Sequence, residues 1–307
     1  ATGEAPANSA MFAASFTGPG AGQMAVFVGD MQVSEAVDAG TDGSYAIAVK
    51  AADVLEQGNV EPNGDPITLT AKFVGNNNMA GVESTVDVTI SAVAKVEITN
   101  GTTAYYGAIK SAWEAALTNT GSTLTLLSNA ETSELLEVPV DKKLSLDCGA
   151  FALTGTHGRT IDLYGTLRFV GGRLRNTKPT GTCVFMYSGS VFIMDKGRVE
   201  GKENALYSQQ NNVTITITGG EFTGNVYIPK ESTVSLSGGT YSRISVASGK
   251  TLSACLAEGR AYSVQYYGLF SRSYVDTLSS LGNVTVVQCD HTGNGICEYT
   301  HATSTTT

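Results

Sequence analysis

Residues 144–151 read LSLDCGAF, residues 167–174 read LRFVGGRL, and residues 215–222 read ITITGGEF. Each stretch is an alternating apolar strand followed by glycine, one variable residue and an apolar or aromatic residue. The pattern occurs five times, with its glycine at positions 149, 172, 197, 220 and 239, so successive copies lie 23, 25, 23 and 19 residues apart. Such self-similarity is typical of a solenoid in which each repeat forms one coil.

The apolar residues of each copy predict which side chains fill the core. Those after the glycines are expected to stack on one another: Phe151, Leu174, Val199, Phe222 and Tyr241. The strands before the glycines contribute Leu144/Leu146, Leu167/Phe169, Val191/Ile193, Ile215/Ile217 and Val234/Leu236. A further short strand contributes Ile161/Leu163, Val184/Met186, Val226/Ile228 and Ile244/Val246. Two to three short strands per coil predict a right-handed parallel β-helix over residues 98–288.

Residues 104–118 have a helical period instead. The apolar residues of this stretch would all lie on one face of an amphipathic helix: Ala104, Ala108, Ile109, Ala112, Trp113, Ala116 and Leu117. A helix at this point lies where the first coil needs a cap over its open end. Trp113, the only tryptophan, is on the apolar stripe and is therefore expected in the core.

Residues 1–97 alternate with a period of two, which predicts short antiparallel strands separated by turns. A unit of this size built from such strands is expected to form a β-sandwich. The alternating sets are Met24/Val26/Val28, Tyr45/Ile47/Val49, Ile67/Leu69/Ala71/Phe73 and Val86/Val88/Ile90. The chain is therefore predicted to be all-β, in two domains.

Charge is distributed unevenly between these domains. Residues 1–97 contain 12 of the 28 acidic residues but only 3 of the 19 lysines and arginines, so they carry the whole net charge of −9. With no basic stripe to neutralise phosphates, nucleic acid is not an expected partner. No apolar run is long enough to predict a membrane span, and the start lacks the pattern of a signal peptide.

The five cysteines are an odd number, which argues against a complete disulfide framework; isolated ones in strands are expected to be small buried residues. Residues 289–307 form a Cys/His-containing tail that ends in a Thr-rich linker. Within it Cys289, His291, Cys297 and His301 offer two thiols and two imidazoles, a set that suits tetrahedral zinc. A Cys289–Cys297 disulfide is the alternative outside the cell.

Two resemblances give these patterns a context. The stretches 44–49, 69–76 and 85–90 resemble bacterial immunoglobulin-like (Ig-like) repeats of cell-surface proteins. Residues 105–116 with 122–127, and residues 256–262 with 284–287, are similar to the start and the close of pectate-lyase-like β-helix modules in large surface proteins of gut Firmicutes. The resemblance implies a secreted segment at the bacterial cell surface.

Pectate-lyase-like enzymes cluster acidic residues to hold calcium and use an arginine base, whereas related hydrolases pair aspartates on neighbouring coils. In this chain the acids do not recur at one position of the coil: Asp147, Asp162, Asp195, Glu200, Glu203 and Glu221. His157 and Arg159 lie in the most enzyme-like fragment, GTHGR at 155–159, but the His has no orienting partner in sequence and an ordinary turn is the simpler interpretation. No catalytic residue or cofactor is therefore predicted, apart from the possible zinc.

Two groups of residues are candidates for binding. Basic residues on adjacent strands are expected to form a lane on one face of the helix that docks an acidic glycan or protein, or else simply to solvate that face: Arg168, Arg173, Arg175 and Arg198. An aromatic segment either caps the solenoid or forms a binding surface, and capping is the preferred interpretation: Tyr262, Tyr266, Tyr267, Phe270 and Tyr274.

The sequence thus predicts a non-catalytic adhesin segment that contacts a host surface glycan or glycoprotein. Three alternatives stay open: a polysaccharide lyase or hydrolase of the β-helix class, a protein that binds host immunoglobulin, and a structural stalk without a ligand.

Overall fold

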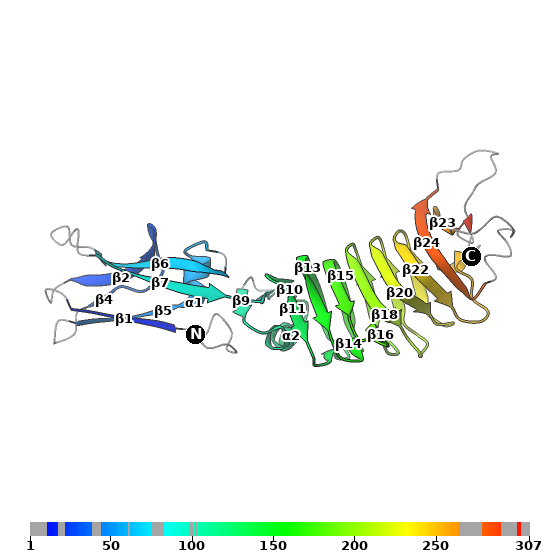
Figure 1. Ribbon diagram of the computed structural model, residues 1–307, viewed down its shortest axis with the longest axis horizontal. Helices are drawn as coiled ribbons and strands as arrows, with labels where there is room; N and C mark the ends of the chain where they lie inside the picture. Colours follow the sequence, from blue (N-terminus) through cyan, green and yellow to red (C-terminus); the bar gives the residue numbers. More distant parts are fainter. Residues whose placement is uncertain are drawn as a thin grey trace. The chain divides into compact units, whose positions relative to one another are not determined.

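The structure is a computed structural model that describes residues 11–17, 22–38, 44–60, 62–74, 83–98, 101, 103–264, 278–289 and 300–301. The chain is all-β, with 59% strand and 8% helix, and forms two compact units (Figure 1). One comprises residues 1–96 and 102–112, the other residues 97–101 and 113–307. Of the helices that the structure describes, none is long and apolar enough to cross a membrane.

The first unit contains two antiparallel sheets. One pairs β1 (Met11–Thr17) with β5 (Ser44–Lys50), and the other has the order β3 (Met31–Gln32), β2 (Gln23–Val28), β6 (Asn63–Val74) and β7 (Glu83–Ser91), with β4 (Val37–Asp38) beside β2. A short helix that the sequence did not indicate, α1 (Ala51–Glu56), follows β5. The four predicted alternating runs therefore all form strands.

The core of the first unit lies where the two sheets meet. Tyr45 of β5 packs edge-on against Phe73 of β6, with ring centroids 5.6 Å apart. On β7, however, the alternation does not produce a buried face, because Val86 is 51% exposed and only Ile90 is buried. Among the described strands β7 pairs with β6 alone, so it is an edge strand.

The second unit is a β-solenoid of about five turns, in which parallel strands of successive coils stack on one another. Each coil contributes to three faces. Face 1 contains β10 (Thr123–Leu126), the first halves of β13 (Lys143–Gly155) and β15 (Thr166–Asn176), then β17 (Val191–Met194), β19 (Thr214–Ile217) and β21 (Thr233–Leu236).

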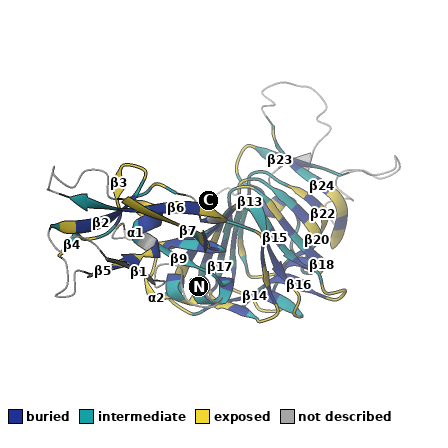
Figure 2. Ribbon diagram, turned by 60° about the vertical axis from the view of Figure 1, so that its left-hand side comes forward, coloured by how far each residue is buried: buried dark blue, intermediate teal, exposed yellow. Residues whose placement is uncertain are grey.

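Faces 2 and 3 complete each coil. Face 2 contains β11 (Ala130–Thr132), the second halves of β13 and β15, and the first parts of β18 (Arg198–Tyr207), β20 (Glu221–Ile228) and β22 (Thr240–Val246). Face 3 contains β12 (Leu136–Val138), β14 (Arg159–Leu163), β16 (Thr182–Met186) and the last parts of β18, β20 and β22. Buried and partly exposed residues alternate along these strands (Figure 2).

The predicted core columns are mostly confirmed. Leu174, Val199, Phe222 and Tyr241 are buried and in register on face 2. On face 3, the pairs Ile161/Leu163, Val184/Met186, Val226/Ile228 and Ile244/Val246 are buried as expected.

Three of the expected core positions in the solenoid are wrong, and a fourth, Val234, is only partly buried. In β17 the buried residues are Phe192 and Met194, while Val191 and Ile193 are partly exposed; all four residues of that strand are apolar, so alternation could not show which face points inward. In the coil containing Gly149, Leu153 rather than Phe151 aligns with Leu174. Two irregularities between Leu146 and Ala152 together shift the register by two residues.

The helix before the solenoid is shorter than predicted. β8 (Ala94–Glu97) is followed by β9 (Thr103–Tyr106), and α2 covers Ile109–Thr118, so residues 104–106 are strand rather than helix. Trp113 is 1% exposed, which confirms its expected place in a core, and its Nε1 donates a hydrogen bond to the carbonyl oxygen of Glu137 at 2.7 Å. Cys148 and Cys183 are buried, as expected for strand cysteines, and Cys255, which lies outside the strands, is buried as well.

At the C-terminal end the strand direction changes. A 3-10 turn, η3 (Ser253–Cys255), precedes β23 (Arg260–Val264), and β24 (Ser280–Gln288) runs antiparallel to both β22 and β23. The two-residue strand β25 (Thr300–His301) pairs with β23. Parallel stacking therefore ends at β22 on faces 2 and 3.

Candidate functional site

Face 3 carries a continuous row of aromatic side chains on its outer side. Tyr164 and Tyr187 stack with centroids 4.0 Å apart, and Tyr187 contacts Phe185 at 5.0 Å. Phe185 contacts Tyr207 at 5.7 Å, and Tyr207 contacts Tyr227 at 5.4 Å. All five side chains are partly exposed, so we call them the aromatic row.

The alternation of the strands places this row on the surface. Phe185, Tyr207 and Tyr227 each follow a buried residue, because Val184, Leu206 and Val226 point into the core. Phe185 and Tyr207 are partners in the register of β16 and β18. Adjacent strands are about 4.8 Å apart, which brings aromatic rings at matching positions into contact.

One end of the aromatic row contains an ion pair between a half-buried arginine and a buried aspartate. The Arg159 guanidinium lies 3.2 Å from Asp162 Oδ2 and donates a hydrogen bond to the Tyr187 hydroxyl at 2.7 Å. The same guanidinium lies over the Phe185 ring, 4.8 Å from its centroid. Tyr187 in turn donates to Asp162 Oδ2 at 3.2 Å. Arg159 is therefore fixed in place at the end of the row.

Asp162 is the buried member of this cluster. Its side chain is only 4% exposed, and its Oδ1 has no hydrogen-bond partner among the described residues. Burial raises the pKa of Asp162, and this outweighs the opposing effects of Arg159 and Tyr187; Glu137 also raises it, whereas His157 lowers it. The buried Asp162 carboxylate thus holds the Arg159 guanidinium in place from the core side of the strand.

A ladder of polar side chains runs beside the aromatic row, at the turn from face 2 to face 3. Asn204 Nδ2 donates to Thr182 Oγ1, and Asn225 Nδ2 donates to Asn204 Oδ1, both at 3.3 Å. Ser245 Oγ donates to Asn225 Oδ1 at 2.8 Å and contacts Ser280 Oγ at 3.1 Å. Thr182, Asn204 and Asn225 are each 7% exposed. We call this series the amide ladder.

The amide ladder and part of the aromatic row border a groove of about 570 Å³. Phe185 and Tyr207 contribute the aromatic side, and the charged residues at its border are Arg159, Glu203 and Arg243. Arg159, Thr182, Asn204, Asn225 and Arg243 are register partners on five successive strands. Four steps of about 4.8 Å separate the first from the last, so the groove extends for about 19 Å along the solenoid axis.

Three of the four arginines in the predicted basic lane, on faces 1 and 2, are ion-paired. Arg168 pairs with Asp195 at 2.8 Å, Arg173 with Glu200 at 2.8 Å, and Arg198 with Glu221 at 2.5 Å. Arg175 is partly buried, and its Nε has no hydrogen-bond partner within the described part of the chain. Faces 1 and 2 therefore carry arginines and acidic residues side by side, which favours the other expected interpretation, that these residues solvate the face.

The predicted aromatic segment is described only in part. Tyr262 lies in β23 and is 1% exposed, so it packs in the core and does not offer a binding surface. Tyr266, Tyr267, Phe270 and Tyr274 lie outside the described residues.

The same holds for most of the Cys/His tail. Cys289 follows β24 and is partly exposed, His301 belongs to β25, and His291 and Cys297 lie outside the described residues. Within the ranges that the structure describes, no group of three or more His, Cys, Asp or Glu side chains is placed to hold a metal ion.

The fragment GTHGR contributes to the candidate site through Arg159 and not through His157. The His157 side chain is exposed on the turn before β14, and its carbonyl oxygen accepts a hydrogen bond from Asn176 Nδ2 at 2.8 Å. This agrees with an ordinary turn. Sequence reasoning missed the aromatic row, although its members recur at the outward positions of strands whose inward positions it had identified.

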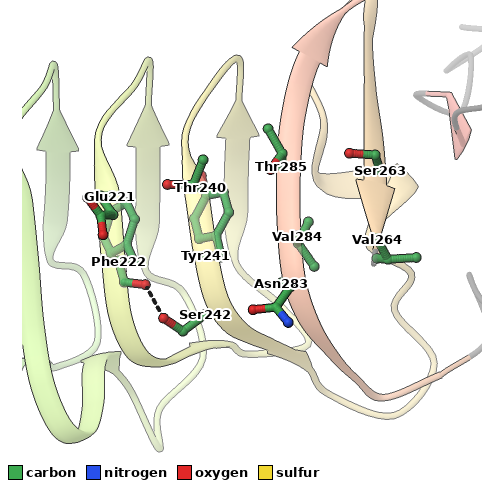
Figure 3. A pocket seen from close by; sticks show the side chains of 10 residues that line it. All are labelled: Glu221, Phe222, Thr240, Tyr241, Ser242, Ser263, Val264, Asn283, Val284 and Thr285. Carbon is green, nitrogen blue, oxygen red and sulfur yellow. Dashed lines mark hydrogen bonds between the residues drawn. The ribbon is translucent and has the colours of Figure 1, made fainter. Parts of the chain in front are cut away.

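A second recess lies where β22 meets β24. It has a volume of about 430 Å³ and is bordered mainly by hydroxyl and amide side chains, including Thr240, Ser242 and Asn283 (Figure 3). Its one carboxylate, Glu221, is ion-paired with Arg198. Phe222 and Tyr241 form its buried base. It has neither exposed aromatic surface nor an uncompensated charge among its described lining residues.

Comparison with known proteins gives no relative: no protein-family model, no curated protein and no solved structure matches this chain. The function is therefore inferred from the site itself.

Proposed function

We propose that the solenoid is the glycan-binding part of a non-catalytic bacterial surface adhesin. The observation that carries this proposal is the groove on face 3, which has aromatic rings on one side and amide side chains along its length. An elongated groove with one matching residue per coil suits a linear polymer that lies parallel to the solenoid axis.

The aromatic row supplies apolar surface for the C–H faces of sugar rings. The planes of Phe185 and Tyr207 are tilted by 58°, and those of Tyr207 and Tyr227 by 40°. Rings that stacked in parallel would cover one another, whereas tilted rings leave part of each face open. Their partial exposure allows this contact without a large apolar patch on the surface.

The amide ladder supplies hydrogen bonds for hydroxyl groups. Each asparagine amide has two N–H donors, and the ladder uses one donor of Asn204 and one of Asn225. The remaining donors belong to side chains at the border of the groove. Sugar hydroxyls both donate and accept, so they are suitable partners for such amides and for Glu203.

A hydrolase is the second candidate, because Glu137 and Asp162 are register partners on adjacent strands and burial raises the pKa of Asp162. The position of Asp162 argues against it. A general acid must reach the leaving group, whereas the Asp162 side chain is 4% exposed and is engaged by Arg159 and Tyr187. Its geometry supports a role in holding Arg159.

Secretion, display at the bacterial cell surface and the Ig-like character of the first unit belong to the same proposal. They are supported by the resemblance of residues 44–90 to Ig-like repeats and of residues 105–127 to β-helix modules of surface proteins. In this arrangement the first unit acts as a spacer, α2 caps the solenoid, and the solenoid presents the groove to a host glycan.

A binding screen tests the proposal. The purified chain is titrated against glycans, mucins and immunoglobulins, and the same glycans are analysed for cleavage products. We expect saturable binding to at least one linear glycan without cleavage. Binding to immunoglobulin polypeptide alone, release of shortened glycans, or no saturable binding would favour the immunoglobulin-binding, enzymatic and stalk alternatives, respectively.

A further inference from the structure

The two ends of the groove differ in charge, although both are marked by an arginine. Arg159 at one end is compensated by the Asp162 carboxylate at 3.2 Å. Arg243 at the other end is exposed and has no carboxylate partner among the described residues. The register places the two arginines on strands four steps apart, which is about 19 Å along the axis.

The middle of the groove is neutral apart from one acid. Thr182, Asn204 and Asn225 carry no charge, and Glu203 is an exposed carboxylate without an ion-pair partner in the described part of the chain. A second anionic group in the ligand would therefore meet Glu203 and would find Arg159 already paired. The Glu203 carboxylate and a second anionic group of the ligand would repel each other, even near the protein surface.

Arg243 is suited to bind one anion. A guanidinium keeps its charge at every physiological pH and offers a planar set of donors that matches a carboxylate or a sulfate. Its neighbours in the register, Asn225 and Gly282, are uncharged. An anionic group at this end would therefore gain an ion pair without displacing an existing one.

We infer that the groove selects a glycan with neutral sugars along most of its length and a single anionic sugar at the end held by Arg243. This inference depends on the proposed function and deepens it, because it assigns the ligand a charge pattern and an orientation. A polyanionic chain such as a polyuronate is expected to bind less well than a singly charged one.

The test uses the full chain and a matched set of linear oligosaccharides of equal length. The set contains neutral compounds, the same compounds with one terminal carboxylated or sulfated sugar, and an oligogalacturonide. Affinities are measured by calorimetry for the parent, for Arg243→Gln, and for Lys196→Gln, which removes an exposed charge outside the groove. Arg243→Lys tests whether the guanidinium geometry is needed in addition to the charge.

We expect the singly charged compounds to bind best. Arg243→Gln should lower their affinity about tenfold or more, as expected for a charge-assisted hydrogen bond. It should lower the affinity for neutral compounds much less, and Lys196→Gln should affect neither class. Arg243→Lys should keep only part of the preference.

Two results would overturn the inference while leaving a glycan-binding groove intact: equal affinity for neutral and singly charged compounds, or tightest binding of the oligogalacturonide. A preference for singly charged compounds that survives in Arg243→Gln would also contradict it, since the anion would then bind elsewhere. If no oligosaccharide binds to the parent, both the inference and the proposed function are wrong.

Discussion

Phe222 and Tyr241 occupy the same position in consecutive coils and stack with their ring centroids 5.0 Å apart and their planes 6° apart. Both are buried. This pair shows directly that the repeated glycine-x-apolar pattern places its apolar residue in a shared core. A charge at either position would have no compensating partner.

The first prediction concerns this core. Phe222→Asp should lower the free energy of unfolding by about 3 kcal/mol or more, because it buries an unpaired carboxylate and removes an aromatic contact. Thermal unfolding measures the effect. Thr223→Asp introduces the same charge at the next, exposed position and should melt close to the parent; equal melting of all three proteins would disprove the register.

The second prediction concerns the amide ladder. Asn204→Ala leaves Thr182 and Asn225 each without one hydrogen bond, so it should destabilise the fold by about 1–3 kcal/mol. The exposed Asn212 is less suitable as a control because its φ of 60° favours asparagine. Gln209→Ala, at an exposed position beside the groove, is the matched change. Denaturant unfolding measures the effect. An equal decrease in the free energy of unfolding for Asn204→Ala and Gln209→Ala would contradict a special role for the amide ladder.

The third prediction concerns Asp162 and pH. Burial raises the pKa of Asp162 in the folded protein, so the folded state holds the proton more tightly than the unfolded state. The contribution of Asp162 to stability should therefore be most favourable below its ordinary pKa of 3.8 and should decrease as pH rises through the higher folded pKa.

Asp162→Asn isolates this contribution, because all other groups titrate in both proteins. The stability of the parent minus that of the variant should fall as pH rises from the range of 3.8 upward, as measured by denaturant unfolding at a series of pH values. A difference that rises with pH over this interval would show that the ion pair with Arg159 outweighs burial.

The sequence predicts the solenoid fold better than it predicts which individual side chains point into the core. The five glycines and the alternation before them suffice for the solenoid, since the core residues at matching positions are apolar in every coil. The same alternation is uninformative in β17, where both faces are apolar, and it cannot reveal the two-residue shift that replaces Phe151 by Leu153.

The candidate site required the register between coils. Arg173 and Glu200 are far apart in sequence, and only their positions on neighbouring coils bring them to 2.8 Å, where Glu200 compensates one charge of the predicted basic lane. Phe185, Tyr207 and Tyr227 likewise have no common spacing in sequence, because the turns between their strands differ in length. A search for aromatic residues one position after each inward residue of face 3 would have found the aromatic row.

The fourth prediction concerns the length of the ligand. If a linear glycan lies along the axis, its affinity should increase with each added sugar until the chain spans the groove, about 19 Å from Arg159 to Arg243, and should then stay constant. A series of oligosaccharides measured by calorimetry tests this. An affinity that is already maximal for a disaccharide would indicate a site confined to one or two coils.

The most direct test of the account is to locate the glycan-binding surface. The affinity of the glycan identified in the binding screen is measured for the parent, for Phe185→Ala/Tyr207→Ala in the groove, and for Phe151→Ala, which removes a partly exposed ring beside Gly149, Gly172 and Gly197 instead. Loss of aromatic stacking should reduce binding by the groove variant at least tenfold, if each ring contributes about 1 kcal/mol. All three proteins should remain folded, as verified by circular dichroism. The account predicts that only the groove variant loses affinity; undiminished binding by that variant, or an equal loss in Phe151→Ala, would contradict it.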